Sequence, residues 1–316
     1  MRYLIPALHD LGEMLNGRRV APIELYEACR KSLHFVGYEG MSMIAVAGID
    51  MAAWDALARA AGVPLCVLLG GSVGPVPAYN CDGTGLRSPA EVASEAAELR
   101  DEGGFRGLKL RLGRERLADD LATIEAVRDA VGGEMSLMVD FNQGLQLGEA
   151  LERCHAIDEL GLAWIEEPIV YDNLEGYARL TADLKTPIQI GENFYGPRAL
   201  YTALQMKACD TSCRISCVLA ASRVGKEQPS LPRQRAYRSP LNLYPEVAAH
   251  VMRVSETAHW LEWQDWANPI LQQPYEVKDG RMHIPDTPGV GLEWDEKAVA
   301  AAHLADTFRS QSSLPA

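Results

Sequence analysis

The sequence has no uninterrupted run of 18 apolar residues, and its N-terminus lacks the charged-then-apolar pattern of a signal region. We therefore predict neither a membrane span nor secretion. Basic residues are scarce: 30 Lys and Arg face 43 Asp and Glu, and the net charge of −13 argues against general nucleic-acid binding. Seven cysteines, an odd number scattered through an acidic chain, favour a reducing cytoplasm.

The remaining composition is that of a globular enzyme with one large or two ordinary domains: 316 residues, 47% hydrophobic and 23% charged. The charge is unevenly distributed, because residues 211–240 have a net charge of +5 and the other 286 residues have −18. The stretch contains Arg214, Arg223, Lys226, Arg233, Arg235, Arg238 and one acid, Glu227. Its composition is foreign to the rest of the chain.

Hydrophobic periodicity divides the chain into a helical beginning and a remainder of repeated βα units. A helical pattern ends at Gly62 and Pro64, and short β-like runs alternate with amphipathic helices from Val76 onward. We expect helices after Ser88 and over residues 114–131. The expected strands are Val76–Cys81, Gly107–Arg111, Ser136–Asp140, Ala163–Glu166 and Ile188–Gly191.

The spacing of these strands favours a closed barrel. Their starts are 25 to 31 residues apart, so eight units need about 220 residues, close to what the chain offers. An open doubly wound sheet is less consistent, because Gly83-Thr84-Gly85 lacks the third glycine of a dinucleotide fingerprint. We predict an α/β fold with a (β/α)8 TIM-type barrel over residues 75–285. A mainly helical part, 1–74, would precede it, and a segment, 286–316, would lie outside the barrel.

Three acidic residues follow apolar runs at the ends of successive expected strands. Asp140, Glu166 and Glu192 lie in SLMVD, LAWIEEP and IQIGEN and are 26 residues apart each time. This spacing places them side by side at the carboxyl-terminal rim of the barrel, where catalytic groups lie. Adjacent carboxylates repel one another and need a hard divalent cation, usually Mg²⁺. The alternative is that each acid caps the following helix.

Two cations and a fourth acid lie close to these positions. Lys109 and Arg111 alternate along one strand, so both face the barrel mouth, where they could bind a carboxylate substrate or move a proton. The alternative is that they form salt bridges with the ligand carboxylates. Glu167, next to Pro168, is interpreted as a supporting residue rather than a ligand.

The motifs, taken in order, resemble one known family. They are AVAGIDMAAWDALARAAGVPLCVLLGG, FRGLKLRLG, MVDFNQ, WIEEP, IGENFYGP and AHWLEW. Along residues 1–210 and 243–305 the chain is similar to the mandelate racemase / muconate lactonizing enzyme family of the enolase superfamily, in its mandelate racemase subgroup. The resemblance implies a barrel with an α+β capping domain, of which residues 1–74 would be a partial remnant. Residues 286–316 would return to the cap.

The resemblance also implies roles for individual residues. The implied Mg²⁺ ligands are Asp140, Glu166 and Glu192. Lys109 matches the first Lys of the family's Lys-x-Lys motif, which assists at the substrate carboxylate. Glu262 matches the acid at the end of the eighth strand, which hydrogen-bonds the developing charge, and Asn142 matches an Asn near the substrate.

The implied activity is Mg²⁺-dependent removal of the proton α to a carboxylate, through an enediolate intermediate. The outcome would be racemisation or dehydration of a 2-hydroxy acid or sugar acid. The implied partner is a small carboxylate substrate, with no nucleic acid and no membrane; intact members would be cytoplasmic homo-oligomers. A cycloisomerase or dipeptide epimerase of the same superfamily is an alternative, as is a non-catalytic remnant of a decayed or mis-sequenced gene.

Three features depart from the family pattern. Arg111 replaces the second Lys of the motif, and a guanidinium is a poor base, which suits a one-base dehydratase better than a two-base racemase. The first part of the capping domain, with a three-stranded sheet, is expected to be missing. Residues 211–241 lack the Met-Pro-Asp…Gly-Gly-Val-Thr motif and the Ser-His motif, whose Asp and His form the base dyad for the other face of the substrate.

A shifted reading frame explains the third departure. With suitably chosen codons and one added base, residues 211–223 reread as Tyr-Val-Met-Pro-Asp-Phe-Met-Arg-Ile-Gly-Gly-Val-Thr, with Asp in place of Ile215. Residues 236–241 reread as Gly-Ile-Pro-Ile-Ser-Ser, and the next codon admits His in place of Asn242. We predict a Mg²⁺-binding chain without the dyad and with little turnover. Sequencing the gene for one lost base near codon 211 and one gained near codon 242 tests this hypothesis.

Overall fold

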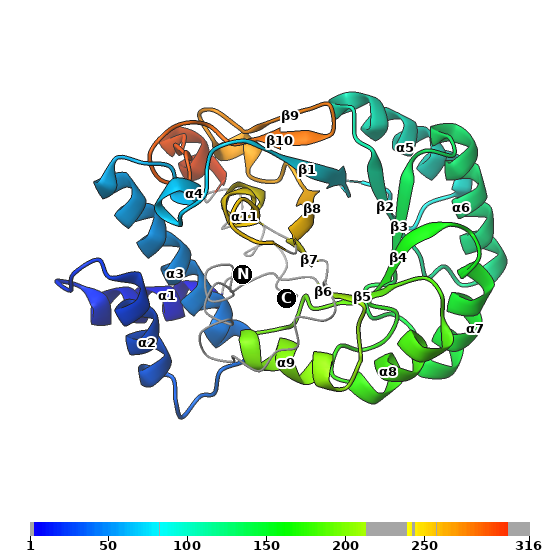
Figure 1. The fold of residues 1–316 in the computed structure, drawn as a ribbon, viewed down its shortest axis with the longest axis horizontal. Coiled ribbons are helices and arrows are strands. Elements are labelled where there is room, and N and C mark those ends of the chain that lie inside the picture. Colours follow the sequence, from blue (N-terminus) through cyan, green and yellow to red (C-terminus); the bar gives the residue numbers. More distant parts are fainter. Residues whose placement is uncertain (1–2, 82, 213–238, 242–243, 257, 303–316) are drawn as a thin grey trace, which may run out of the picture.

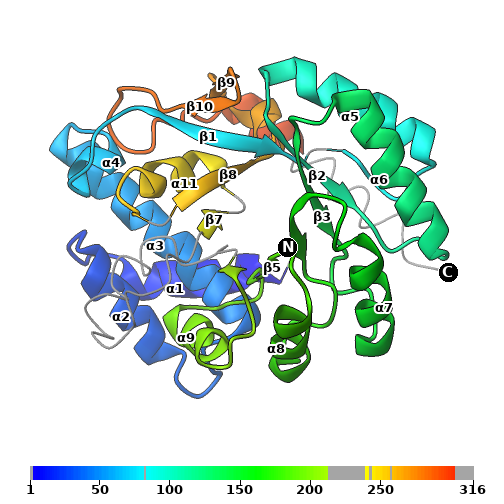
Figure 2. The same ribbon diagram turned by 45° about the vertical axis from the view of Figure 1, so that its right-hand side comes forward.

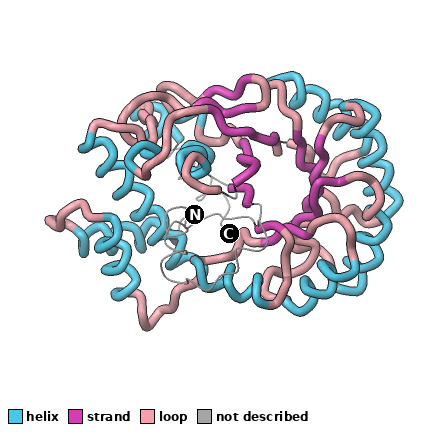
Figure 3. Tube along the Cα trace, viewed as in Figure 1, coloured by secondary structure: helices cyan, strands magenta, loops and turns pink. Residues whose placement is uncertain are grey.

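Parallel strands form a barrel in the computed structural model, which describes residues 3–81, 83–212, 239–241, 244–256 and 258–302 (Figure 1). The strands are β1 Pro75–Asn80, β2 Gly107–Arg111, β3 Ser136–Asp140, β4 Leu162–Glu166, β5 Ile188–Ile190, β6 Thr211–Ser212, β7 Ser239–Leu241 and β8 Ala258–Trp263. Neighbours pair in parallel from β6 through β1 to β8 and β7, and β6 lies next to β7 (Figure 3). The predicted eight-stranded barrel is confirmed, and the five expected strands agree with the structure to within one residue at each end.

Helices cover the outside of the barrel. They are α5 Pro89–Gly103, α6 Leu117–Val131, α7 Leu147–Ile157, α8 Leu174–Asp183, α9 Pro197–Gln205 and α11 Pro245–Met252. The apolar faces of α5 to α9 pack with the strands β2 to β5 in one buried core, and α11 packs with β1 and β8 in a second. The expected cap of α5 is present: the Ser88 side chain accepts the N–H of Glu91, whose carboxylate accepts the N–H of Ser88.

One predicted helix boundary is wrong. The helix expected from residue 114 begins at Leu117, because the buried carboxylate of Asp120 accepts the backbone N–H groups of Gly113 at 3.1 Å and Arg114 at 3.2 Å. The Arg153 side chain pairs with the same carboxylate at 2.8 Å. Residues 113–116 are therefore held as a loop between β2 and α6.

The basic stretch, residues 211–240, is described by the structure only at its two ends. β6 pairs with β5 through Thr211, opposite Gln189, and β7 pairs with β8. Residues 213–238 and 242–243 lie outside the described residues. The frame-shift hypothesis and the absence of the Asp–His dyad therefore stay predictions.

Four helices before the barrel form the cap, defined here as residues 4–68 (blue in Figure 1). They are α1 Leu4–Leu15, α2 Pro22–Ser32, α3 Gly40–Ala61 and α4 Leu65–Leu68. The cap has its own small core, in which Cys29, Met43 and Val46 are buried. It lies on one side of the barrel, where α4 contacts α11 (Figure 2).

α3 is long and apolar enough, by length and composition alone, to cross a membrane. Over 18 of its residues the mean hydropathy is 1.4, and 39% of them are buried. Asp50, Asp55 and Arg59 interrupt the apolar sequence of this helix, so it contains no run of 18 apolar residues. Asp50 is buried in the protein, and Arg59 pairs with Asp55 at 2.8 Å. α3 packs against α1 and α2, as the core helix of a domain does.

C-terminal residues join the barrel to the cap. β10 Arg281–His283 pairs with β1 and with β9 Glu276–Lys278, and the chain then returns to α3 and α4. Leu65 donates its N–H to the Gly289 carbonyl at 2.7 Å, and Val290 donates its N–H to Asp55 at 2.6 Å. Gly289 has a φ of +80°, and a Cβ there would lie 2.3 Å from Asp55 Oδ1. The junction therefore requires glycine; the domain limits themselves stay a prediction.

A buried histidine lies at the same junction. His250 on α11 accepts the Cys66 N–H at Nδ1, at 3.1 Å, so the neutral ring has its proton on Nε2, which lies 3.1 Å from the Tyr275 hydroxyl. That hydroxyl donates to the Val290 carbonyl. Burial lowers the pKa of His250 to about 4, so a neutral ring connects the barrel, the cap and the C-terminal segment.

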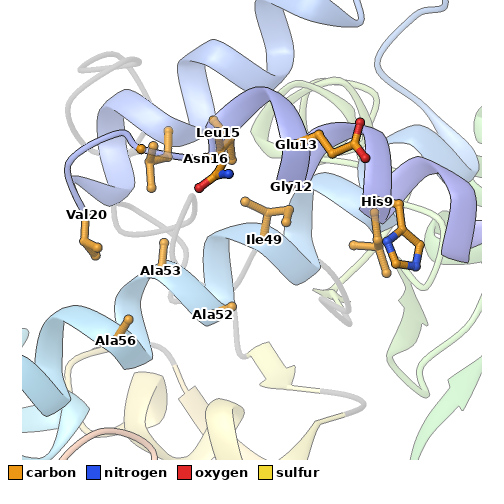
Figure 4. A pocket seen from close by; sticks show the side chains of 13 residues that line it. His9, Gly12, Glu13, Leu15, Asn16, Val20, Ile49, Ala52, Ala53 and Ala56 are labelled. Atoms are coloured by element: carbon orange, nitrogen blue, oxygen red, sulfur yellow. The ribbon is translucent and has the colours of Figure 1, made fainter.

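A groove of about 620 Å³ lies on the cap between α1 and α3 (Figure 4). Small and apolar side chains, including Leu8, Ile49 and Ala53, form most of its lining, with His9 and Glu13 at one end. None of its lining residues is a predicted site residue.

Candidate active site

The strand ends bring the three predicted carboxylates together. Asp140 and Glu166 are the last residues of β3 and β4 and face each other in register, and Glu192 follows β5 by two residues. Each residue offers one carboxylate oxygen, and the three oxygens lie within 4.8 Å of one another. Asp140 and Glu166 are buried, and Glu192 is half-buried. Oxygen ligands at this spacing fit one hard divalent cation.

The alternative interpretation of these acids as helix caps is wrong. The N-cap residues of α7, α8 and α9 are Gln146, Asn173 and Gly196. All three carboxylates are thus left at the barrel mouth.

Lys109 lies among the carboxylates. Its Nζ is 2.7 Å from Glu262 Oε1, 2.9 Å from Glu166 Oε1 and 3.2 Å from Asp140 Oδ2. Burial alone lowers the pKa of Lys109, but Glu166 and Glu262 outweigh burial and hold this pKa well above its ordinary value. Lys109 is therefore a fixed cation in the middle of the site.

Arg111 and Asn142 lie nearer the opening. The Arg111 side chain is 24% exposed, contacts Asp140 Oδ2 and donates to Asn142 Oδ1 at 2.9 Å. Burial lowers the pKa of Arg111, but nearby acids, led by Asp140, keep it above the ordinary value. The salt bridges predicted as an alternative for Lys109 and Arg111 are present, and both side chains point to the mouth.

Two side chains that the sequence did not single out hold Glu166. Trp164 Nε1 at 3.1 Å and Gln189 Nε2 at 2.9 Å both donate to Glu166 Oε2. Burial raises the pKa of Glu166 well above its ordinary value, against the opposing effect of Lys109. Period-2 alternation could have revealed Trp164, two residues before Glu166 on the same strand face, and Gln189 is the polar residue in the strand Ile188–Ile190.

The barrel interior beside Lys109 is aromatic. The Tyr79 ring packs edge-to-face on Trp164, with centroids 5.4 Å apart, and on Trp260 at 6.4 Å. The Lys109 Nζ lies 5.9 Å from the Tyr79 ring. Cys81, the residue after β1, accepts a hydrogen bond from Gln264 Nε2 at 3.3 Å, and burial together with Glu262 raises the pKa of its thiol well above the ordinary value.

Glu167 supports Glu192 rather than joining the three clustered carboxylates. Its Oε1 accepts the backbone N–H groups of Gly191 at 3.2 Å and Glu192 at 3.0 Å. Burial and the adjacent Glu167 raise the pKa of Glu192 to about 7.

Two family models match the chain. The mandelate racemase / muconate lactonizing enzyme N-terminal domain matches residues 5–70, and the enolase C-terminal domain-like model matches residues 91–220. These regions include the cap and the strands that carry the three carboxylates.

Similar proteins align with most of the chain. It is 35% identical over 278 residues to the L-talarate/galactarate dehydratase of Salmonella typhimurium, covering 86% of this chain and 69% of that protein. The solved structure of an enolase from the alpha proteobacterium bal199, with bound Mg, has a TM-score of 0.90 and 58% identity, covering 95% of this chain and 84% of that one. An enolase from Bradyrhizobium complexed with magnesium and mandelic acid has a TM-score of 0.88 and 35% identity, covering 95% and 82%.

The fold and the carboxylate cluster define a (β/α)8 barrel of the enolase type, with an acidic triad positioned to bind a metal ion. The chain belongs to the mandelate racemase / muconate lactonizing enzyme family, as its motifs predicted. The sequence also predicted a superfamily of enzymes that includes isomerases and hydro-lyases. This prediction is confirmed, because the relatives of the chain include cycloisomerases and sugar-acid dehydratases.

Proposed function

We propose that this chain binds one Mg²⁺ ion through Asp140, Glu166 and Glu192. The observation that carries this proposal is the clustering of their oxygens within 4.8 Å. With Glu262, four carboxylates face the two cations Lys109 and Arg111, and a divalent cation would balance the excess negative charge. The Mg ions in the two similar solved structures support the choice of metal.

The substrate we propose is a small 2-hydroxy acid or sugar acid that loses its α-proton. Bound Mg²⁺ would supply Lewis-acid stabilisation of the substrate carboxylate. Lys109, held as a cation by Glu262 and Glu166, would donate hydrogen bonds to the charge that develops there. Arg111 and Asn142, at the opening, would contact the substrate.

We also propose that the chain lacks the base that the family uses. Lys109 and Arg111 both have pKa values above their ordinary range, so both hold their protons at neutral pH. The dyad implied by the family falls on Ile215 and Asn242 of this sequence. We therefore propose a Mg²⁺-binding protein with strongly impaired turnover.

Arg111 bears on the alternatives within the superfamily. Residual turnover would suit dehydration, which needs one base, better than racemisation. The cycloisomerase and epimerase alternatives need Lys in place of Arg111 and are less favoured. We also propose three segments with the limits 1–74, 75–285 and 286–316. Intact members of the family would be cytoplasmic and would form homo-oligomers.

The test combines two measurements on the purified chain. Titration calorimetry with MgCl₂ should show saturable binding at one site, and proton NMR in D₂O should show no α-proton exchange from mandelate or galactarate above the protein-free rate. Absence of Mg²⁺ binding would contradict the metal site. Exchange at about 1–10³ s⁻¹, the ordinary range of enzymes, would contradict the impairment.

A further inference from the structure

Glu167 makes contacts at three successive strand ends although it is not one of the clustered carboxylates. It is 1% exposed, directly follows Glu166, and its Oε1 holds the N–H groups of Gly191 and Glu192 at 3.2 and 3.0 Å. Its backbone N–H donates to the Gln189 carbonyl at 3.0 Å. The turn that carries Glu192 is thereby fixed relative to Glu166.

The other oxygen of Glu167 reaches the loop after β3. Gln143 Nε2 donates to Glu167 Oε2 at 2.7 Å, and the Gln143 backbone N–H donates to the Glu167 carbonyl at 2.6 Å. The Tyr171 N–H donates to Gln143 Oε1 at 3.1 Å, which fixes the orientation of this amide. Gln143 is three residues after Asp140, so Glu167 connects the strand ends that carry all three clustered carboxylates.

Backbone conformation shows that this arrangement is imposed by the surroundings. Asn142, Gln143 and Glu167 have φ values of +45°, +62° and +39°. These are left-handed conformations, which cost non-glycine residues roughly 1–3 kcal/mol each and persist where the surroundings over-determine them. All three strained residues lie at the barrel mouth beside the carboxylates.

The network continues from the barrel mouth to the cap. Gln143 Nε2 also donates to Asn193 Oδ1 at 2.8 Å, and Asn193 Nδ2 donates to the Tyr195 hydroxyl at 3.0 Å. The Tyr195 ring packs against the cap core formed by α1, α2 and α3. The carboxylate spacing is therefore connected by hydrogen bonds to a side chain that contacts the cap.

We propose that Glu167 is a positioning residue, which sets the spacing of Asp140, Glu166 and Glu192 for a divalent cation while Gln143 holds its carboxylate in place. This inference rests on the proposed Mg²⁺ site and names residues beyond it. Hydrogen-bonding partners of metal ligands typically change metal affinity by about 10- to 100-fold when removed. The proposed effect on Mg²⁺ affinity arises from geometry. A variant that keeps the charge of residue 167 but shortens its side chain must therefore bind Mg²⁺ more weakly.

Glu167→Asp and Gln143→Leu are the test variants, because both preserve the net charge of the mouth. Glu167→Asp withdraws the carboxylate by one methylene from the Gly191 and Glu192 N–H groups, and we expect its Kd for Mg²⁺ to rise about 10- to 100-fold. Gln143→Leu frees Glu167 Oε2 while Oε1 keeps its two backbone N–H groups, and it also removes the side-chain hydrogen bonds to Asn193 and Tyr171. We expect a rise of about 3- to 10-fold, because only one of the two Glu167 oxygens loses its partner. The matched control is Glu159→Asp, since Glu159 is exposed and pairs with Lys185.

Titration calorimetry with MgCl₂ and thermal unfolding in EDTA are measured on every variant. Weaker Mg²⁺ binding with an unchanged unfolding temperature in EDTA supports the proposal. Wild-type affinity in Glu167→Asp overturns it, as does weaker binding matched by the Glu159→Asp control. If Glu167→Asp does not fold, the Mg²⁺ affinity of Gln143→Leu is the test, and a wild-type affinity of this variant overturns the proposal. An absence of Mg²⁺ binding by the wild-type chain would instead defeat the proposed function, and this inference with it.

The reciprocal pair Glu167→Gln with Gln143→Glu sharpens the result. A Gln at 167 can accept the two backbone N–H groups and donate to a Glu at 143, whose second oxygen can accept the Tyr171 N–H. Turning the Asn193 amide then completes the network to Tyr195. We expect this pair to bind Mg²⁺ more tightly than Glu167→Asp; weaker binding by the pair would contradict the hydrogen-bond assignment.

Discussion

Two buried polar clusters, one around Lys109 and one around His250, differ in how their polar groups are stabilised in the protein interior. At the barrel mouth, the Lys109 ammonium group forms ion pairs with three carboxylates, those of Asp140, Glu166 and Glu262. At the cap junction, a single imidazole stays neutral and exchanges hydrogen bonds with Cys66 and Tyr275. Burying a charge is costly unless it is paired, whereas a neutral and fully hydrogen-bonded group is not.

The difference separates a functional site from a structural one. The His250 cluster satisfies each donor and acceptor in the way that stability alone favours. The barrel mouth around Lys109 also holds Glu166 and Glu192, whose pKa values are raised by burial, so their ionised forms cost stability. A protein keeps such groups where a ligand or a reaction requires them.

The largest effect is expected when the ammonium group at the barrel mouth is removed. In EDTA, Lys109→Met should lower the free energy of unfolding by about 3–5 kcal/mol, because three buried acids lose their shared cation. Urea unfolding measures the loss. The control Lys185→Met, at an exposed pair, should cost no more than about 1 kcal/mol. Equal losses in the two variants would show that the charged cluster is not held by Lys109.

The second prediction concerns how the stability of the neutral His250 cluster depends on pH. The pKa of His250 is about 4 in the folded protein and 6.5 in its ordinary state, so between these values the unfolded chain binds more protons. Stability should therefore fall as the pH drops from 6.5 to 4, with His250 contributing up to about 3 kcal/mol. His250→Gln can accept from Cys66 and donate to Tyr275 without titrating. A wild-type pH slope in this variant would contradict the assignment.

A third test separates function from stability at one carboxylate. Glu192→Gln should weaken Mg²⁺ binding by about 100-fold or more, since a neutral amide replaces a charged ligand. In EDTA at pH 8 it should be at least as stable as the wild type, because a half-buried charge next to Glu167 is removed. Calorimetry and urea unfolding measure the two effects. A large loss of stability without a loss of Mg²⁺ affinity would make Glu192 structural.

The smallest expected effect belongs to Tyr275. Tyr275→Phe leaves the Val290 carbonyl and the His250 Nε2–H without their partner, and we expect a loss of about 1–2 kcal/mol in urea unfolding. Tyr171, which is 36% exposed, provides the matched Tyr→Phe control. A loss as small as that of Tyr171→Phe would show that the junction does not depend on this hydroxyl.

The barrel and its carboxylates were predictable because both depend on local order in the sequence. Strands recur at βα spacing, and Asp140, Glu166 and Glu192 end their strands at equal intervals. The Glu167–Gln143 contact was not predictable, since it depends on backbone conformations that non-glycine residues rarely adopt. Neither was the contact between His250 and Cys66, because no periodic pattern connects two residues 184 positions apart.

The hydrogen bond from Trp164 to Glu166 also gives the protein an internal optical reporter. The indole is 2% exposed, and its N–H points directly at one of the clustered carboxylates. A change in the charge or position of that carboxylate must alter the electric field along the indole and therefore the wavelength of its emission. Occupancy of the site should be readable from intrinsic fluorescence, without a label and without turnover.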